Sequence, residues 1–292
     1  MRGLDLMDRR ERPANEHVAC ETLRDVLEHH TYVAGVPRKV GHVLCDLCDA
    51  PGGRRDRQLV LGDLVTEYDA RGGWSFVRSV HDGYVGYVKS DGLDGVKSHT
   101  HWVTSRFATL YTDPDFKSPD CGLLPLGAQV TVSSEAKGYM RCDLGWIADQ
   151  HVRPISERAD DPVGVAEKLL GTPYLWGGNS SFGIDCSGLV NIALKLCGYA
   201  APADSDQQMR NLGDPVQTGN YVRNDLLFWR GHVAWVYDER HILHANAHHM
   251  AVTLERIDEA IPRIRSKGDG EIIAHKRIWP LDKFSQFRIS CS

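Results

Sequence analysis

The 292-residue chain contains no run of about 18 apolar residues, the length needed for a helix to span a membrane. Basic charge is also scarce, because 34 lysines and arginines stand against 39 acidic residues and leave a net charge of −5. A basic surface for nucleic acid is therefore not expected. The apolar content of 42% and the charged content of 25% are typical of a folded protein and exclude a largely disordered chain.

Residues 1–20 lack the apolar core of a secretory signal peptide, so we expect a cytoplasmic protein. The eight cysteines are spread over a long chain, which favours free thiols over a disulfide framework. Cys45 and Cys48 form a Cys-x-x-Cys pair, but no second close pair accompanies them and their surroundings are strand-like. We therefore expect neither a metal role nor a redox role for this pair.

Two β-rich segments with similar patterns occupy the first half of the chain. Short apolar runs broken by glycine predict strands at 59–66, 74–77 and 82–88, then at 108–111, 126–132, 139–142 and 145–147. Both segments contain a Leu-Gly-x-x-Val turn and strand followed by a glycine-aromatic hairpin, which makes an imperfect repeat of about 55 residues. This pattern predicts two small antiparallel barrels or sandwiches.

The composition changes near residues 154–161, where a third segment begins. Asp161 and Pro162 are an N-cap and first-turn signal for a helix over 163–170, which Gly171 would end. A buried helix is expected over 189–197, and strand-like runs follow at 224–236, 242–245, 251–254 and 271–278. A helix-rich part followed by antiparallel strands predicts an α+β domain.

Cys186 lies where a glycine-punctuated loop meets the start of this buried helix. Unpaired backbone N–H groups and the helix dipole favour an anion there, so we expect the pKa of the thiol to fall below its ordinary value of about 8.5. This position favours a role for Cys186 as a nucleophile. The alternative is that Cys186 is a small hydrophobic side chain that packs beside the helix and has no chemical role.

A cysteine hydrolase also needs a base within reach of the thiol and a third group that orients the base. His232 follows Gly231 in the apolar run 225–236. A hairpin centred on Asp238 would place His232 opposite His244 on one face of the sheet, and a slip of one residue would separate them. A zinc site built from the local histidines is the alternative, but carboxylates and thiols do not fall at the usual ligand spacings.

Four motifs with these residues occur in order: Gly171-Thr172-Pro173-Tyr174, Asp185-Cys186-Ser187-Gly188, Gly231-His232-Val233-Ala234 and Leu243-His244-Ala245. In these motifs the region 161–280 resembles the NlpC family of papain-like bacterial cell-wall cysteine peptidases. The whole chain resembles the subgroup that carries two SH3-like domains before the catalytic one.

The resemblance implies an α+β fold in which a papain-like cysteine peptidase domain is preceded by two small all-β SH3-like barrels. The expected parts are an N-terminal extension, a first barrel, a second barrel and the catalytic domain, over residues 1–35, 36–97, 98–157 and 158–292.

Members of this subgroup hydrolyse the γ-D-glutamyl to diamino-acid bond of peptidoglycan stem peptides. For this chain we expect neither a cofactor nor a metal. The resemblance implies that Cys186 is the nucleophile, that His232 is the base and then the acid, and that His244 orients His232. Tyr174 would help to bind the oxyanion. One such donor can lower a barrier by about 3 kcal/mol.

The same subgroup binds the free amino group of an N-terminal L-alanine. The resemblance implies that Asp185, Ser187 and Ser205 supply the catalytic domain's part of this subsite. Tyr84 and Asp49 are the candidates for a tyrosine and an acid lent by the first barrel, and Tyr87 or Glu67 are the alternatives for these two. A carboxylate facing an ammonium is a sensible match, because leaving either charge buried and unpaired costs several kcal/mol.

The sequence therefore predicts a cytoplasmic cysteine peptidase that recycles wall fragments by releasing L-Ala-γ-D-Glu through a thioester. A need for a free alanine amine would spare intact wall, where muramic acid blocks that amine. The alternatives are an exported endopeptidase that acts on intact stems and a wall-fragment binding protein without activity. Peptidoglycan-derived peptides are the expected partners, with no nucleic acid and no membrane, and the oligomeric state stays open.

Overall fold

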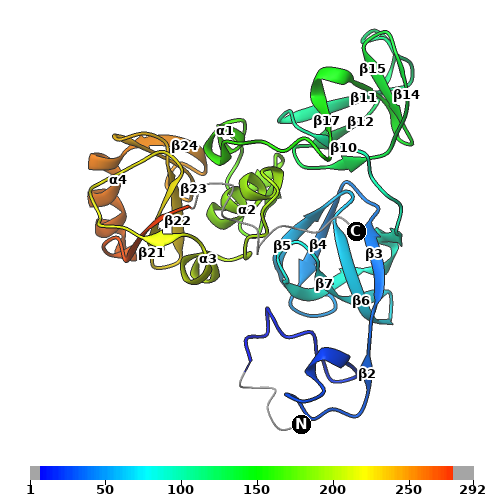
Figure 1. Ribbon diagram of the computed structural model, residues 1–292, viewed down its shortest axis with the longest axis horizontal. Helices are drawn as coiled ribbons and strands as arrows, with labels where there is room; N and C mark the ends of the chain where they lie inside the picture. The colour runs from blue at the N-terminus through cyan, green and yellow to red at the C-terminus, as the bar shows by residue number, and fades with distance from the viewer. Residues whose placement is uncertain (1–6, 279–292) are drawn as a thin grey trace. The chain divides into compact units, whose positions relative to one another are not determined.

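The computed structural model describes residues 7–278, and Figure 1 labels most of their helices and strands. Internal contacts divide the chain into two compact units. The first unit runs to Trp102 and includes Thr109–Leu124 and Ala128–Asp149. The second unit comprises Val103–Ala108, Pro125–Gly127 and the chain from Gln150 onward. The domain boundaries expected from the sequence stay predictions.

The regular secondary structure of the first unit is almost entirely β-strand. Its largest sheet has seven strands in the order β5-β4-β8-β7-β6-β3-β9. The strands are β3 (Val36–Val40), β4 (Leu44–Cys48), β5 (Arg55–Val60), β6 (Leu64–Arg71), β7 (Trp74–Ser79), β8 (Val85–Lys89) and β9 (Leu93–Gly95). The single strand expected over 59–66 is wrong, because Gly62 adopts a φ of 87° and turns the chain between β5 and β6.

The N-terminal extension packs on this sheet. It contains β1 (Ala19–Cys20), the 3-10 turn η2 (Glu21–Leu23) and β2 (Tyr32–Val33). Ala14, Val18 and Leu27 share one hydrophobic cluster with Phe76 and Val85 of the sheet. The extension is therefore part of the first unit's core.

A second set of strands forms a five-stranded sheet in the order β12-β11-β16-β15-β14. The elements of this part, with the short turns beside them, are η3 (Ser90–Gly92), β10 (His101–Val103), β11 (Phe107–Tyr111), β12 (Asp120–Pro125), β13 (Gln129–Val130), β14 (Val132–Ala136), β15 (Tyr139–Cys142), β16 (Gly145–Ala148), η4 (Asp149–His151) and β17 (Val152–Pro154). The expected β-rich N-terminal region, followed by an α+β domain, is confirmed.

The second unit carries the α+β domain. Its main sheet has six strands in the order β20-β25-β21-β22-β23-β24, with antiparallel pairs throughout. The strands of this sheet are β20 (Asp214–Pro215), β21 (Asp225–Trp229), β22 (His232–Val236), β23 (His241–Asn246), β24 (Ala251–Arg256) and β25 (Ala274–Arg277), whereas β18 (Asn179–Ser180) and β19 (Gly183–Ile184) form a separate two-stranded sheet. The helices are α1 (Pro162–Glu167), α2 (Cys186–Leu196), α3 (Ser205–Asn211) and α4 (Ile257–Ile264), and a π-type turn, η5 (Arg265–Asp269), follows α4.

Two of these helices begin where the sequence predicted. Helix α2 is buried along its whole length, and Gly198 follows it with a φ of 86°, which is the left-handed stop expected after a helix. Helix α1 ends at Glu167 rather than at residue 170, because the next residues form bonds to the third preceding carbonyl, such as Leu170 N–H to Glu167 O. Asp161 occupies the N-cap position of α1, but its carboxylate pairs with Arg223 at 2.7 Å and does not cap the helix.

The run 224–236 forms two strands and not the single strand that the sequence suggested. Gly231 adopts a φ of 75° and turns the chain, so that Trp229 of β21 pairs with His232 of β22. His232 therefore becomes the first residue of its strand, directly after a tight turn.

None of the helices within residues 7–278 is long and apolar enough to cross a membrane. The seven cysteines in this part of the chain are all free thiols, and Cys291 lies outside it. The described residues also contain no group of three or more histidine, cysteine, aspartate or glutamate side chains placed to hold a metal ion.

Candidate active site

Cys186 is the first residue of α2, and the N-cap before it fixes its position. The Asp185 carboxylate accepts a hydrogen bond from the backbone N–H of Gly188 at 2.7 Å and another from the Ser187 hydroxyl at 3.1 Å. Its second oxygen accepts from the backbone N–H of Gly177 at 2.9 Å. These bonds tie the helix start to the preceding glycine loop and hold the thiol at the helix end.

The pKa of Cys186 is raised to about 12, so the lowering expected from the helix start is wrong. Burial is the main cause, since only 7% of the residue is exposed, and the charge of Asp185 adds to it. Hydrogen bonds from the backbone N–H groups of Val233, Ser187 and Cys186 act in the opposite direction but are weaker. The thiol is therefore neutral at physiological pH, and it needs a base to become a nucleophile.

Tyr174 is held beside the nucleophile by the backbone. Its segment runs alongside β19, where Ile184 N–H donates to the carbonyl of Pro173 and Leu175 N–H donates to the carbonyl of Ile184. Ile184 stands two residues before Cys186. Burial raises the pKa of Tyr174 well above its ordinary value, and the charges of Cys186 and Asp185 raise it further. The phenol therefore keeps its proton and can donate it to an anion that forms near the thiol.

The two histidines lie on β22 and β23 with a register that differs from the expected one. Trp235 pairs with Leu243 and Val236 with Ile242, so the hairpin is centred on Glu239 and not on Asp238. Continuing this register sets His232 two residues away from the position opposite His244. The slip is even, and both side chains therefore still lie on one face, as diagonal neighbours.

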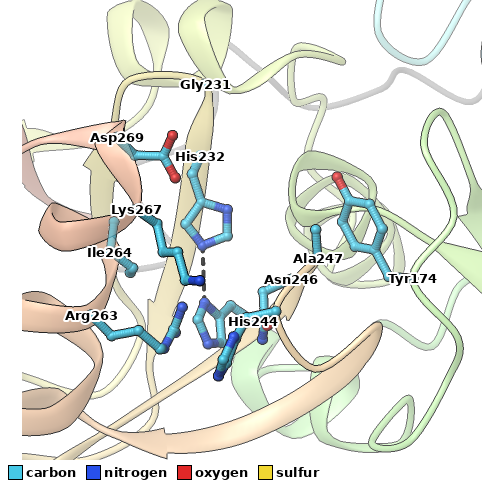
Figure 2. Close-up of a pocket in the computed structure, with 11 residues that line it drawn as sticks. Tyr174, Gly231, His232, His244, Asn246, Ala247, Arg263, Ile264, Lys267 and Asp269 are labelled. Carbon is cyan, nitrogen blue, oxygen red and sulfur yellow. Dashed lines mark hydrogen bonds between the residues drawn. The ribbon is translucent and has the colours of Figure 1, made fainter.

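A hydrogen-bonded chain connects these histidines to a carboxylate on the third strand. His232 Nε2 lies 2.9 Å from His244 Nδ1, and His244 Nε2 lies 3.0 Å from Glu255 Oε2 (Figure 2 draws the first of these bonds). Arg263 of α4 donates to both oxygens of Glu255, with its Nε 2.8 Å from Oε1. His232, His244 and Glu255 thus form a diagonal line across β22, β23 and β24.

The position of Arg263 follows from the packing of α4. Ile257, Ala260 and Ile264 of this helix share a hydrophobic cluster with Ala234 and Ile242 of the sheet. Burying these side chains fixes the helix against the strands that carry the histidines. The guanidinium, one residue before Ile264, then reaches Glu255.

Glu255 decides which ring nitrogens carry protons. Hydrogen bonds and charges from His244 and Arg263 outweigh the effect of burial and hold the pKa of Glu255 at about 2, so it is an ionised carboxylate. It therefore accepts a hydrogen bond from His244 Nε2–H. A neutral His244 then accepts at Nδ1 from His232 Nε2–H, which leaves the lone pair on His232 Nδ1.

His232 is neutral at physiological pH. Burial, followed by the nearby His244 and Arg263, lowers the pKa of His232 to about 3. Burial likewise lowers the pKa of His244. A neutral imidazole with a free Nδ1 lone pair can take the thiol proton as the sulfur attacks a carbonyl, and the charge that develops on His232 is then stabilised through His244 by Glu255.

The amine-binding candidates of the second unit lie around the helix start. Ser187 is the residue after the nucleophile and is 8% exposed. Ser205 begins α3, and this helix is attached to the nucleophile's helix by Gln208, whose amide donates to the Ser187 carbonyl at 2.9 Å. Asp185 and Ser187 thus lie at the start of α2 and Ser205 at the start of α3, and the Gln208 side chain connects the two helices.

The candidates of the first unit occupy two different environments. Asp49 accepts a hydrogen bond from the backbone N–H of Arg54 at 2.9 Å and lines a pocket of about 250 Å³ together with Tyr87. Tyr84 is 3% exposed, and the Cζ atom of the Arg57 guanidinium lies 5.8 Å from the centre of the Tyr84 ring. Glu67, the other alternative, pairs with Arg38 at 2.8 Å. Within this unit, Asp49 and Tyr87 therefore share a surface, whereas Tyr84 is a core residue.

A pocket of about 390 Å³ opens beside the two histidines in the second unit. Figure 2 shows Tyr174 on one side of it and Arg263, Lys267 and Asp269 on the other. Its volume falls in the range of small-molecule sites. The pocket gives a ligand access to His232.

Sequence reasoning missed Glu255, Arg263, Lys267 and Asp269. The strand predicted at 251–254 stopped one residue before Glu255, whereas β24 continues to Arg256 and places Thr253 opposite His244. Period-two alternation then sets Glu255 on the face of His244. A longer strand prediction would have found it, whereas the other three residues belong to a helix and turn that were not predicted.

Comparisons with known proteins agree on the nature of both parts. Residues 171–267 match the model of the NlpC/P60 family, and residues 47–93 match that of the bacterial dipeptidyl-peptidase SH3 domain. A γ-D-glutamyl-L-lysine dipeptidyl-peptidase of Bacillus cereus is 30% identical over 200 residues, which cover 60% of this chain and 60% of that protein. The chain thus spans less than two thirds of the length of that relative.

A second relative and a solved structure extend the match. A γ-D-glutamyl-L-lysine dipeptidyl-peptidase of Bacillus subtilis is 26% identical over 238 residues, or 75% of each chain. The crystal structure of an NlpC/P60 family protein from Bacillus cereus matches with a TM-score of 0.70 and 22% identity, over 84% of this chain and all of that one. At this identity the structural match supports the fold alone.

Proposed function

We propose that this chain, whose residues 171–267 belong to the NlpC/P60 family and whose residues 47–93 are a bacterial dipeptidyl-peptidase SH3 domain, is a cysteine peptidase. Its substrate is a peptide with an N-terminal L-Ala-γ-D-Glu unit. It cleaves the amide bond between the γ-carboxyl group of D-glutamate and the amine of the next diamino acid. The names of the two Bacillus relatives support this choice of bond.

The observation that carries the proposal is the hydrogen-bonded chain from His232 through His244 to Glu255, beside a helix that begins with Cys186. An idle cysteine has no need of a neutral imidazole with an oriented lone pair. The Val233 backbone N–H, next to His232, hydrogen-bonds to the Cys186 thiol and links the strand of the base to the nucleophile.

The reaction follows from these positions. His232 Nδ1 takes the proton of Cys186 as the sulfur attacks the γ-carbonyl carbon, and Tyr174 with a backbone N–H at the helix start donates to the oxyanion. His232 then gives the proton to the leaving amine, and the C–N bond breaks to form a thioester. His232 next takes a proton from water as the water oxygen attacks the thioester carbonyl. The C–S bond then breaks, and His232 returns the proton to the sulfur, which releases L-Ala-D-Glu and restores the free thiol.

We further propose that the enzyme requires the free amine of L-alanine and acts in the cytoplasm on wall fragments that are being recycled. Asp185 supports this, because its carboxylate stands next to the nucleophile. Hydrogen bonds from the backbone N–H groups of Gly177 and Gly188 hold this carboxylate at the helix start. A carboxylate and an ammonium form a strong, charge-assisted hydrogen bond. A muramyl-blocked alanine carries no ammonium and would not form this bond.

The bond assignment is tested by mass spectrometry of the products from L-Ala-γ-D-Glu-L-Lys. We expect L-Ala-D-Glu and free lysine. Release of alanine, or an intact peptide, would contradict the assignment.

The requirement for a free amine is tested with the N-acetylated peptide. N-acetylation of the alanine should reduce kcat/KM strongly, and equal turnover of the blocked peptide would favour the exported endopeptidase instead.

Tyr174→Phe should lower kcat about a hundredfold, because it removes one donor to the oxyanion and leaves the ring in place. KM should change little, since the bond is made mainly in the transition state. Steady-state kinetics on the same tripeptide measure both values. Tyr237→Phe is the matched control, because its hydroxyl bonds to Glu167 and not to the site. An unchanged kcat for Tyr174→Phe would exclude the hydroxyl from the reaction.

A further inference from the structure

Two oppositely charged side chains line the pocket beside His232, at its wall opposite Tyr174 (Figure 2). These are Lys267 and Asp269, which are both exposed. Neither forms a hydrogen bond or ion pair with any side chain in the described part of the protein. Arg263, in contrast, is bound to Glu255. The pocket therefore holds one cation and one anion that are open to a ligand.

The turn that carries these two charges is held in place. The Arg230 guanidinium donates to the Gly268 carbonyl at 3.0 Å, which attaches η5 to the turn before His232. Arg265 and Glu271 pair across the turn at 2.7 Å, and Gly268 adopts a φ of 104° that permits the reversal. Lys267 and Asp269 thus flank a residue that is fixed relative to the base.

Chemistry decides which part of the substrate enters this pocket. His232 must hand its proton to the leaving amine, so the leaving group has to lie against the imidazole. His232 lines the pocket, whereas Cys186, Asp185 and Ser187 do not. The acyl half of the substrate is bound at the thiol of Cys186 and extends toward Asp185 and Ser187, so the pocket remains for the leaving half.

We infer that this pocket is the subsite for the leaving diamino acid, with Asp269 pairing with its side-chain ammonium and Lys267 with its carboxylate. The inference rests on the proposed function. A diamino acid residue at the C-terminus carries these two opposite charges at neutral pH, which the pocket matches. The pair selects for a basic side chain over an apolar one of equal length.

The test compares kcat/KM for L-Ala-γ-D-Glu-L-Lys with that for the norleucine analogue, which has the same carbon chain but no ammonium. The wild type should prefer lysine by about fivefold, the value of an exposed ion pair. Asp269→Asn should abolish the preference while leaving the rate on norleucine unchanged. Asp269→Lys should reverse it in favour of L-2-aminoadipate, whose side chain ends in a carboxylate.

Lys267→Met should lower kcat/KM about fivefold for the lysine tripeptide. It should not change kcat/KM for the C-terminal amide of that peptide, which lacks the carboxylate. Glu239→Gln, at the exposed β22–β23 turn, is the control for a change of one charge and should keep the lysine preference. In one outcome, the wild type cleaves both peptides of each comparison with kcat/KM ratios that Asp269→Asn and Lys267→Met leave unchanged. That result would overturn the subsite and leave the proposed function standing. Failure of the wild type to cleave any γ-D-glutamyl peptide would overturn both.

Discussion

Cys186→Ala should lose at least about 10⁴-fold in kcat for L-Ala-γ-D-Glu-L-Lys, because the thioester cannot form without the sulfur. The fold should remain intact. Alanine is a good helix former, and the N-cap bonds of Asp185 go to Gly188, Ser187 and Gly177, not to the thiol. Removing a buried sulfur leaves only a small cavity. Steady-state kinetics and thermal unfolding, measured on the same sample, separate the two effects.

Cys197→Ala is the matched control for this variant. Cys197 is the residue that ends the same helix, is 3% exposed and is likewise a free thiol with a raised pKa. Its replacement should affect stability and leave kcat unchanged. Equal turnover by wild type and Cys186→Ala would remove the thiol from the mechanism, whereas no turnover by the wild type would favour a binding protein.

Glu255→Gln should lower kcat by about 10³-fold although Glu255 never touches the substrate. The glutamine amide can donate to His244 Nε2, which forces the proton of His244 onto Nδ1. His244 then donates to His232 Nε2, and the proton of His232 moves to Nδ1, where the lone pair is needed. The base is lost while its position is kept. This result would make Glu255 a positioning residue that acts through two histidines.

The pH dependence of the free energy of unfolding should reveal the interactions of the Glu255 carboxylate without any measurement of activity. The pKa of Glu255 in the fold is about 2, below its ordinary value of 4.5, so its bonds stabilise the fold above pH 4.5, by up to about 3 kcal/mol. This contribution is lost as the pH falls from about 4.5 to about 2. Glu255→Gln should therefore be less stable than the wild type at pH 7, and urea unfolding should show the difference shrinking over that window.

Glu259→Gln serves as the control, because Glu259 is an exposed acid on α4 that lies 3.6 Å from Arg256. It should alter neither kcat nor the pH dependence of stability. A wild-type kcat for Glu255→Gln would show that the histidines hold their tautomers without the carboxylate. It would thereby contradict the placement of the protons on His244 Nε2 and His232 Nε2.

The sequence was sufficient to predict the α+β class, the β-rich region before it and the helix that begins at Cys186. Each of these follows from a local signal: glycine-broken apolar runs in the first case, and a glycine loop before an apolar helix in the second. The pairing of His232 with His244 also followed, because only the parity of their separation matters for the face. The expected register was wrong by two residues, but an even shift leaves both histidines on the same face of the sheet.

What the sequence could not give depends on burial and on unpredicted elements. The pKa of Cys186 was expected to fall at a helix start, but enclosure of the thiol outweighs the dipole, and enclosure is a tertiary property. Rapid alkylation of Cys186 at neutral pH is consequently not expected of the free enzyme. Arg263, Lys267 and Asp269 lie on α4 and η5, whose weak sequence signals include Pro262 inside the helix.

The most direct test of the mechanism is labelling by a dipeptide, L-Ala-γ-D-Glu, in which the γ-carboxyl group is replaced by a chloromethyl ketone. The thiolate displaces chloride and forms a stable thioether, so the adduct does not depend on turnover. We expect peptide mapping to place one adduct on Cys186, to find it greatly reduced in His232→Ala, and to find it reduced when the alanine amine is acetylated. An adduct spread over other cysteines, or labelling of Cys186 that is independent of His232, would contradict the mechanism.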